Sequence, residues 1–424
     1  MAFPPVAILD GVRTPFVKAN GQFAALAPLT LATHVTKPLL GHDARQTVTD
    51  ERTQVVFGTA LSYPKYVYGG REVAIASGHP YVNGHGTEYA CATSTKTAVE
   101  AAHLLALGTA DMVVAGGSES LSHQPLIVSD AAEQVARMPR HRDPQTFEKA
   151  LANLSIAELL PVLPPVSEPY NNETLAWSAE TLMQAYGVSR GDADAYAAQT
   201  QQRAAAAKAH LAPRIRAVDV NGTPVTEDDL VRGDTTVEVL ATLPAVFETG
   251  GVTSGNASRL TDGAAAVLLA SHTHAKQHDL TPQGFITHAA LTAHDPAVGV
   301  LLGPAFAIPR VLDAAGMTLA DVDVIEIHEA FAGQVLANLN ALASDTFATQ
   351  HLNRTRAFGV IDPEEINQWG GSLSLGHPFG ATGSRLIMHA VDRLKKEDKQ
   401  VALIALCIGG ARGAAMIIQR DMEA

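Results

Sequence analysis

The chain has 424 residues, of which 46% are hydrophobic and 17% charged, which excludes a single small domain and is ordinary for a globular protein. Its formal net charge of −13 argues against nucleic acid and anionic membrane surfaces as general partners. No apolar stretch approaches the roughly 20 residues that span a bilayer, so no transmembrane segment is expected. The two cysteines lie far apart and do not suggest a disulfide framework, which favours a reducing compartment.

The first residues, MAFPPVAILDGVRTPF, enter a strand-like apolar run at 6–9. This leaves no room for the charged, apolar and cleavage regions of a signal peptide. A cytoplasmic location is therefore expected.

The first candidate for chemistry is Cys91, in the stretch YACATSTKTAVEAA. A polar, small-residue turn ends there, and apolar and alanine positions continue at helical spacing to Gly108, followed by a short buried strand and glycines in DMVVAGGSES. A thiol at a helix start faces unpaired backbone N–H groups and the helix dipole, which favour the nucleophilic thiolate. The alternative is that Cys91 is a small buried apolar residue.

Residues 121–250 differ in character from the segments on either side. This stretch is first basic, then proline-rich at LLPVLPPVSEPY, and continues into an alanine-rich helix expected around 192–209. We interpret it as an inserted loop domain.

His328 lies within VIEIHEAFAGQVLANLNAL. The segment has strand-like alternation at 324–327 and becomes helical after Glu329, so His328 is expected at a strand-to-helix junction. Such junctions often carry chemistry. The alternative is a hydrogen-bonded structural histidine.

The C-terminal stretch repeats the order of elements seen around Cys91. A glycine-rich turn, GGSLSLGHPFGATG, precedes a helix expected over 381–396, a buried strand over 401–406 and a pair of glycines. The repeat predicts an internal duplication, layered α/β sheets and a site where the two halves meet. We interpret His377, among tight glycine turns, as a base beside a thiol, the alternative being an ordinary loop residue.

The second cysteine, Cys407, ends the predicted C-terminal strand and is followed by IGGARG. Glycines there allow close backbone approach and let N–H groups face developing negative charge. We interpret Cys91 and Cys407 as occupying equivalent ends of the duplicated unit.

Three other patterns are set aside. His274 and His278 in HTHAKQH have helical i,i+4 spacing but no adjacent carboxylate motif, so a solvated helix is favoured and no metal is expected. GGSES at 116–120 lacks the second glycine of a serine nucleophile elbow. No G-x-G-x-x-G motif follows a predicted strand, which argues against dinucleotide binding.

Six segments together resemble the thiolase family, in an order and spacing that cover nearly the whole chain. They are VAILDGVRTPF, ACATS around Cys91, GVTSGNASRLTDGAAAVLL at 251–269, HEAFA at 328–332, GGSLSLGHPFGATG at 370–383 and CIGGARG at 407–413. The resemblance implies a five-layered αβαβα fold, an α/β architecture of two similar halves with the inserted loop domain. It also implies an acyltransferase that uses CoA to cleave 3-ketoacyl-CoA to acetyl-CoA and a shortened acyl-CoA.

Histidine rather than asparagine at the start of HEAFA, together with LLPVLPPVSEPY, resembles the thiolase subunit of trifunctional fatty-acid oxidation complexes. This implies a role in β-oxidation, with reverse Claisen condensation open to the same residues. On this basis the N-terminal half is expected to comprise 1–120 and 251–280. The loop domain would be 121–250 and the C-terminal half 281–424.

The resemblance also implies roles for individual residues. Cys91 would attack the 3-keto carbon after His377 takes its proton, giving an acyl-enzyme. Cys407 would supply a proton to the departing acetyl-CoA enolate, or remove that proton in the condensation direction. These roles require a second thiol beside the first.

Two oxyanion sites are implied, because negative charge develops on different oxygens at different stages. Backbone N–H groups of Cys91 and Gly409 would serve one, and His377 with His328 or its bound water the other. Ser258, in GNAS, would contact the pantetheine arm of CoA. CoA is a substrate in this scheme, and no permanently bound cofactor is expected.

Contacts to the CoA phosphates are open among five arginines of the loop region, each of which is equally explained as solvated surface charge: Arg137, Arg140, Arg142, Arg214 and Arg216. Three departures from the family pattern concern the site. Cys91 is followed by Ala-Thr, Ala411 replaces a glycine, and Leu175-Ala176 followed by Trp177 stands where the family often has methionine and glycine. The acyl-chain preference is therefore left open.

The expected partners follow from the same resemblance. The chain is expected to form a homodimer or homotetramer and to bind a hydratase/dehydrogenase α subunit. The segment 137–165 would make peripheral membrane contact or, alternatively, cover the active site. Two rival functions remain. A decarboxylating 3-ketoacyl synthase would not need the thiol of Cys407, and a catalytically silent scaffold subunit would not need the intact set of cysteines and histidines.

Overall fold

The computed structural model describes residues 1–41, 52–163, 167–248 and 250–422. Residues 164–166, part of the LLPVLPPVSEPY stretch, lie outside the described residues. The described chain forms one ten-stranded sheet and a small two-stranded one. The strands of the large sheet are β1 (Ala2–Arg13), β2 (Val17–Lys18), β3 (Thr53–Gly58), β4 (Asn83–His85), β5 (Met112–Ser120), β8 (Thr261–Ser271), β9 (Gly284–Ala293), β10 (Val324–Ile327), β11 (Val401–Ile408) and β12 (Arg412–Gln419).

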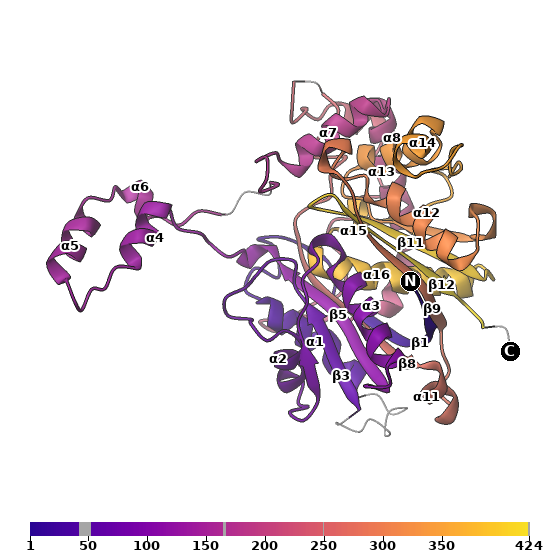
Figure 1. Ribbon diagram of the computed structural model, residues 1–424, viewed down its shortest axis with the longest axis horizontal. Helices are drawn as coiled ribbons and strands as arrows, with labels where there is room; N and C mark the ends of the chain where they lie inside the picture. The colour runs from indigo at the N-terminus through magenta and orange to yellow at the C-terminus, as the bar shows by residue number, and fades with distance from the viewer. Residues whose placement is uncertain (42–51, 164–166, 249, 423–424) are drawn as a thin grey trace.

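The two halves of the large sheet have the same arrangement (Figure 1). In the first half β3 and β5 are parallel, and β8 and β1 follow in antiparallel pairing. In the second half β10 and β11 are parallel, and β12 and β9 follow in antiparallel pairing. Strands β1 and β9 pair with each other and join the halves edge to edge. The predicted internal duplication is confirmed, and the two halves share one continuous sheet.

Helices form three layers around the two sheet halves. They are α1 (Pro28–Leu40), α2 (Gly70–Ala76), α3 (Thr93–Ala106), α12 (Gly303–Ala315), α13 (Ala332–Leu342), α14 (Asp345–His351) and α16 (Thr382–Lys396). Helices α3 and α16 contact each other between the halves and share a buried cluster with strands of both. Helices α1 and α2 pack on the outer face of the first half, and α12 and α13 on the outer face of the second. These layers confirm the predicted five-layered α/β fold.

The contact between the two central helices depends on a glycine. A Cβ atom on Gly383, in the first turn of α16, would lie 2.3 Å from Oγ1 of Thr95 in α3. Any larger residue would push the helices apart. Because the N-terminal ends of both helices carry the site described below, this close approach determines its geometry.

The region between β5 and β8 adds a set of helices and a hairpin. They are α4 (Asp130–Ala136), α5 (Pro144–Ala152), α6 (Ile156–Leu159), α7 (Leu175–Ala185), α8 (Arg190–Ala206), α9 (Lys208–Leu211), β6 (Val218–Val220), β7 (Thr223–Val225) and α10 (Val237–Ala241). Helices α7 and α8 pack on α13, so they join the core of the second half. The helix expected around 192–209 is α8, which ends at Ala206.

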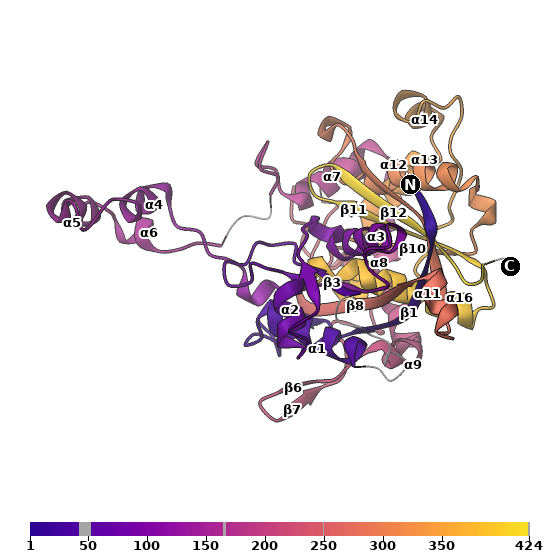
Figure 2. The same ribbon diagram turned by 60° about the horizontal axis from the view of Figure 1, so that its bottom comes forward.

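Helices α4, α5 and α6 form an arm that projects away from the body of the molecule (Figures 1 and 2). Its base is a backbone pairing in which Ile127 and Val162 each donate an N–H to the other's carbonyl oxygen, at 2.9 and 2.8 Å. Neither α5 nor α6 has a buried residue. No helix among the described residues is long and apolar enough to cross a membrane.

One interpretation of the sequence is wrong. Cys91 lies in the 3₁₀ turn Ala90–Ala92 before α3, whose counterpart in the second half is the turn Phe379–Ala381 before α16. Cys407 lies instead in β11, whose counterpart is β5. The two cysteines therefore come from different ends of the duplicated unit, and the packing of the halves brings them to one region.

Candidate functional site

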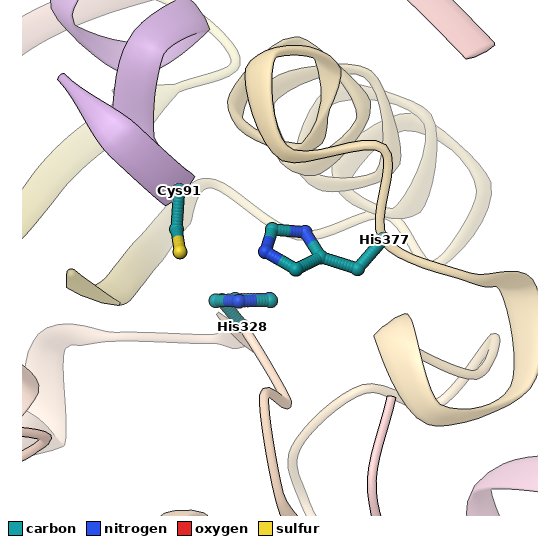
Figure 3. A group of neighbouring side chains, drawn as sticks. All are labelled: Cys91, His328 and His377. Carbon is teal, nitrogen blue, oxygen red and sulfur yellow. The ribbon is translucent and has the colours of Figure 1, made fainter. Parts of the chain in front are cut away.

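Three predicted site residues from distant parts of the chain converge. One side-chain atom each of Cys91, His328 and His377, namely the sulfur and two imidazole nitrogens, lies within 4.8 Å of the others. Figure 3 shows the two rings side by side, with a nitrogen of His377 directed toward the sulfur. The rings are 4.0 Å apart between centroids, at an interplanar angle of 44°.

Cys91 is held in an unusual backbone turn. The preceding residue, Ala90, has a φ of 43°, in the left-handed region that disfavours residues with a Cβ atom. Burial raises the pKa of the Cys91 thiol to about 11, although the backbone N–H groups of Gly409 and Cys91 and the cation of Arg412 oppose the rise. The expectation of a stabilised thiolate at the helix start is therefore wrong for the free protein. Desolvation outweighs the helix start, and the thiol is neutral.

His377 follows Gly376, whose φ of 96° lets the chain turn sharply after α15 (Ser372–Leu375). Its Nδ1 lies 2.6 Å from Oγ1 of Thr382, so the nitrogen that faces Cys91 in Figure 3 is Nε2. Burial, with a smaller contribution from the cation of Arg385, lowers the pKa of His377 to about 3. The ring is neutral, with Nε2 directed at the thiol.

His328 directly follows β10 and is fully buried. Its backbone N–H donates to the carbonyl of Ala405 in the neighbouring β11, and its Nδ1 lies 2.8 Å from Oγ of Ser372. Burial lowers the pKa of His328 well below its ordinary value, and the cation of Arg385, like any proton taken up by His377, would lower it further. It too is neutral, and Nε2 has no hydrogen-bond partner among the described residues.

Cys407 and Gly409 bring the end of β11 to the same place. Cys407 is fully buried, and burial together with the nearby Cys91 raises the pKa of its thiol well above its ordinary value. Gly409 lies on the wall of the pocket described next. The structure thus assembles both cysteines, both histidines and the predicted oxyanion glycine in one region.

A pocket of about 760 Å³ opens onto Cys91, His377 and Gly409, and Ser258 lies on its wall. The wall also carries several large apolar side chains, which are Leu61, Leu121, Leu175, Phe247, Phe331 and Phe379. Trp177, expected to shape the pocket, does not line it. Its ring packs edge-on against that of Phe247, with centroids 5.1 Å apart, and so supports the wall from behind.

Comparison with known families decides the relationship. Residues 6–273 match the family described as "Thiolase, N-terminal domain", and residues 280–420 match "Thiolase, C-terminal domain". This chain belongs to the thiolase family. The resemblance drawn from the sequence motifs is confirmed.

Individual thiolases are similar along their whole length. A "3-ketoacyl-CoA thiolase" of Yersinia enterocolitica is 36% identical, and the match covers 98% of this chain and 96% of the relative. A "Probable 3-ketoacyl-CoA thiolase" of Caenorhabditis elegans is 37% identical, and the match covers 98% of this chain and 94% of the relative. Human mitochondrial 3-ketoacyl-CoA thiolase, solved in complex with CoA, superposes with a TM-score of 0.83 at 29% identity and 99% coverage of both chains. Bacillus anthracis acetyl-CoA acetyltransferase superposes with a TM-score of 0.80 at 27% identity, again with 99% of both chains covered.

Two buried carboxylates of this thiolase were missed as site residues. Glu119, in the GGSES stretch set aside as a serine motif, accepts hydrogen bonds from the N–H of Ala60, the hydroxyl of Tyr63 and the N–H of Gly380. It thereby ties the loop after β3 to the turn before α16. Burial raises the pKa of Glu119 to about 7 against these hydrogen bonds. A glutamate at the end of a strand predicted to be buried was the available signal.

The second missed carboxylate is Glu168, beside the outer glycines of CIGGARG. Its Oε1 accepts the N–H of Gly410 at 2.8 Å, and the side chain is buried on the pocket wall. The neighbouring Arg412 donates Nε to the carbonyl of Gly409 at 3.0 Å and stacks on the ring of Tyr89. Together they hold the loop after Cys407 from both sides.

The arginines considered for the CoA phosphates occupy other places. None of the five lines the pocket around Cys91. Arg137 and Arg140 belong to the projecting arm, where Arg137 pairs with Glu133 and Arg140 lies over the ring of Phe147. Arg214 is engaged by two aspartates of the body, including Asp392 at 2.5 Å.

The cluster of Cys91, His328 and His377 is also the one group of three spaced for a metal ion among the described residues. Thiolate and imidazole are ligands that suit Zn²⁺. Their neutral states, held by burial, instead suit proton transfer between a thiol and a base. The rings of His274, in α11 (His272–Gln277), and of His278, just after that helix, lie 4.3 Å apart between centroids at an angle of 37°, away from this cluster.

Proposed function

We propose that this protein catalyses CoA-dependent cleavage of 3-ketoacyl-CoA to acetyl-CoA and a shortened acyl-CoA. The observation that carries the proposal is the meeting of a neutral thiol, Cys91, with a neutral imidazole, His377, at the end of an apolar pocket. The names of the similar proteins support the same substrate class. No bound cofactor is needed, because CoA itself is the second substrate.

In the first step the sulfur of Cys91 attacks the 3-keto carbon while its proton passes to Nε2 of His377. Both groups are neutral beforehand, so proton transfer accompanies attack and does not precede it. The bond between the 2- and 3-carbons then breaks. The acyl group remains on Cys91 as a thioester, and the electron pair of the broken bond leaves with the acetyl-CoA enolate.

The second thiol completes the balance. Cys407 gives its proton to the enolate carbon, which releases acetyl-CoA and leaves a thiolate at Cys407. The thiol of CoA then attacks the acyl-Cys91 thioester, its proton passes to Cys407, and His377 returns its proton to the departing sulfur of Cys91. All three side chains end in their starting states.

Two sets of donors stabilise the oxygens that carry negative charge. Backbone N–H groups of Cys91 and Gly409 point toward the sulfur region and serve one oxygen. His328 and His377 serve the other. Loss of one such donor typically costs about 3 kcal/mol of barrier height. Ser258, on the pocket wall, contacts the pantetheine arm.

The deciding experiment is CoA-dependent loss of 3-ketoacyl-CoA by the purified chain, across short, medium and long acyl chains. Turnover that disappears in Cys91→Ala supports the proposal. Decarboxylation of a malonyl thioester without thiolysis would favour the synthase alternative. Complete inactivity, with and without a partner subunit, would favour the silent scaffold.

The finer role is also a proposal. We propose that the protein acts in fatty-acid β-oxidation in a reducing, cytoplasmic compartment, as a homodimer or homotetramer. In each chain, 1–120 with 251–280 would form the N-terminal half and 281–424 the C-terminal half, with 121–250 as an inserted loop domain. The apolar arm supports a hydratase/dehydrogenase α subunit as partner. Its solvent-facing apolar side chains are Val128, Leu151, Ile156, Leu159 and Leu160.

The arm can be tested without disturbing the body. Replacing 128–161 by a short turn keeps the pairing of Ile127 with Val162. Unchanged thiolysis with lost co-purification of the α subunit would support a partner-docking arm. Lost vesicle binding would indicate membrane contact instead, and lost thiolysis would indicate that the arm covers the active site.

A further inference from the structure

Arg385 is a fully buried arginine next to the site, on α16. Its Nη2 donates to Oγ of Ser372 at 2.8 Å, while its Nε and Nη1 have no hydrogen-bond partner among the described residues. The charges of Glu326 and Glu329 act on this cation from nearby, but burying it without a hydrogen-bonded carboxylate remains costly. Such a cost points to a role besides packing.

The acceptor of that bond, Ser372, lies between Arg385 and a site histidine. Its Oγ is 2.8 Å from Nη2 of Arg385 and 2.8 Å from Nδ1 of His328. An arginine only donates, so it occupies a lone pair of the serine oxygen. A second lone pair remains, but among the described residues Nδ1 of His328 is the one acceptor within reach of the serine proton, so the proton points there. Nδ1 then accepts, and the ring proton of the neutral histidine sits on Nε2.

His377 has the opposite arrangement. Its Nδ1 lies 2.6 Å from Oγ1 of Thr382, and that hydroxyl has the carbonyl oxygen of Pro378 as an acceptor at 3.5 Å. When the threonine proton goes to that carbonyl oxygen, Nδ1–H of His377 donates to the threonine. Nε2 of His377 is left with a lone pair, facing Cys91 (Figure 3).

We propose that Arg385, acting through Ser372, is a positioning residue that fixes His328 as an Nε2–H donor. Two adjacent neutral imidazoles are thereby given different tasks. His328 donates to the oxyanion, and His377 accepts the thiol proton. The inference rests on the proposed thiolase function for its catalytic consequence, but the tautomer itself is a property of the free protein.

The kinetic test is Ser372→Ala in two backgrounds, the natural chain and His328→Asn. In the natural chain kcat should fall about 10-fold or more with KM little changed, since removal of such orienting partners typically costs 10- to 100-fold. In the His328→Asn chain the same change should have no further effect, because there is no imidazole to orient. Equal losses in both backgrounds would overturn the inference in favour of a packing role.

Ser374 provides a matched control on the same short helix. Its buried hydroxyl contacts Gly371 and Thr200 and neither catalytic histidine. Ser374→Ala should therefore have the same effect in both backgrounds, through stability alone. Arg385→Met should be non-additive with Ser372→Ala, and if that variant does not fold, the serine variants decide the question.

A readout without turnover separates this inference from the proposed function. In protein labelled with ¹⁵N-histidine, the signals lost in His328→Asn identify His328. They should show a protonated Nε2, which becomes mixed in Ser372→Ala. A protonated Nδ1 in the natural chain would overturn the inference. Absent thiolysis with a protonated Nε2 would sink the proposed function and leave the tautomer assignment standing.

Discussion

The imidazoles of His328 and His377 face each other with centroids 4.0 Å apart, and each is anchored at Nδ1 to a hydroxyl. Both are neutral because burial lowers the pKa of each. Two positively charged rings would repel at this distance, so their closeness requires neutrality. The site is therefore prepared for proton transfer at neutral pH.

The two cysteines should fail in different ways when replaced. Cys91→Ala should abolish both thiolysis and acylation of the protein by acyl-CoA, since the acyl group has no acceptor. Cys407→Ala should still be acylated, while carbon–carbon cleavage falls by about 10² or more. Intact mass spectrometry after incubation with acyl-CoA distinguishes the two. Near-normal turnover by Cys91→Ala would refute its role.

Stability should fall on the acid side. His377 has a pKa of about 3 when folded and an ordinary value of 6.5, so the unfolded chain binds its proton first as the pH falls. The contribution of neutral His377 to the free energy of unfolding is fully present above pH 6.5 and is lost progressively toward pH 3. At pH 5 the loss is about 2 kcal/mol for this residue. Tm measured from pH 8 to pH 5 should decline, and decline less in His377→Asn.

The alkaline side has the opposite sign. Cys91 has a pKa of about 11 when folded and an ordinary value of 9, so its stabilising effect is complete below pH 9 and is lost as the pH rises to 11. The rate at which iodoacetamide alkylates Cys91 should accordingly be low at pH 7 and increase with pH up to the pKa of about 11. A rate independent of pH between 6 and 9 would contradict a neutral thiol.

Glu168 should influence catalysis by holding the loop after Cys407. Glu168→Ala frees the N–H of Gly410 and lets the adjacent Gly409 drift, so kcat should fall about 10-fold or more. Glu173→Ala is the control, because Glu173 is exposed on the same segment and, among the described residues, its side chain bonds only Asn171. Equal kcat for the two variants would show that the loop keeps its geometry without Glu168.

The aromatic pair at the pocket wall should set acyl-chain preference. Phe247→Ala enlarges the pocket and should raise the ratio of kcat/KM for long over short substrates several-fold, at about 0.8 kcal/mol for each additional buried methylene. Trp177→Ala should shift the ratio in the same direction by releasing Phe247. Phe358 lies under Arg354 and outside the pocket, so Phe358→Ala should leave the ratio of kcat/KM for long over short substrates unchanged.

Much of this fold followed from local patterns. The helical spacing after Cys91, the buried strand ending near Cys407 and the repeated glycine turns predicted the two halves, and the structure agrees to within a few residues. Patterns of this kind survive in one sequence because helix and strand periodicity are local properties. The continuous pairing of β1 with β9 has no such local signature.

The site divides in the same way. The sequence by itself determined which residues carry chemistry, since the motifs around Cys91, His328, His377 and Cys407 are short and contiguous. Tertiary structure alone decided their protonation states, because desolvation and charge at Cys91 and His377 arise from segments far away in the chain. It also decided the hydrogen-bond partners of four supporting residues, Glu119, Glu168, Ser372 and Arg385. Hydrogen bonds between separate segments leave no spacing in the sequence from which to predict the partners.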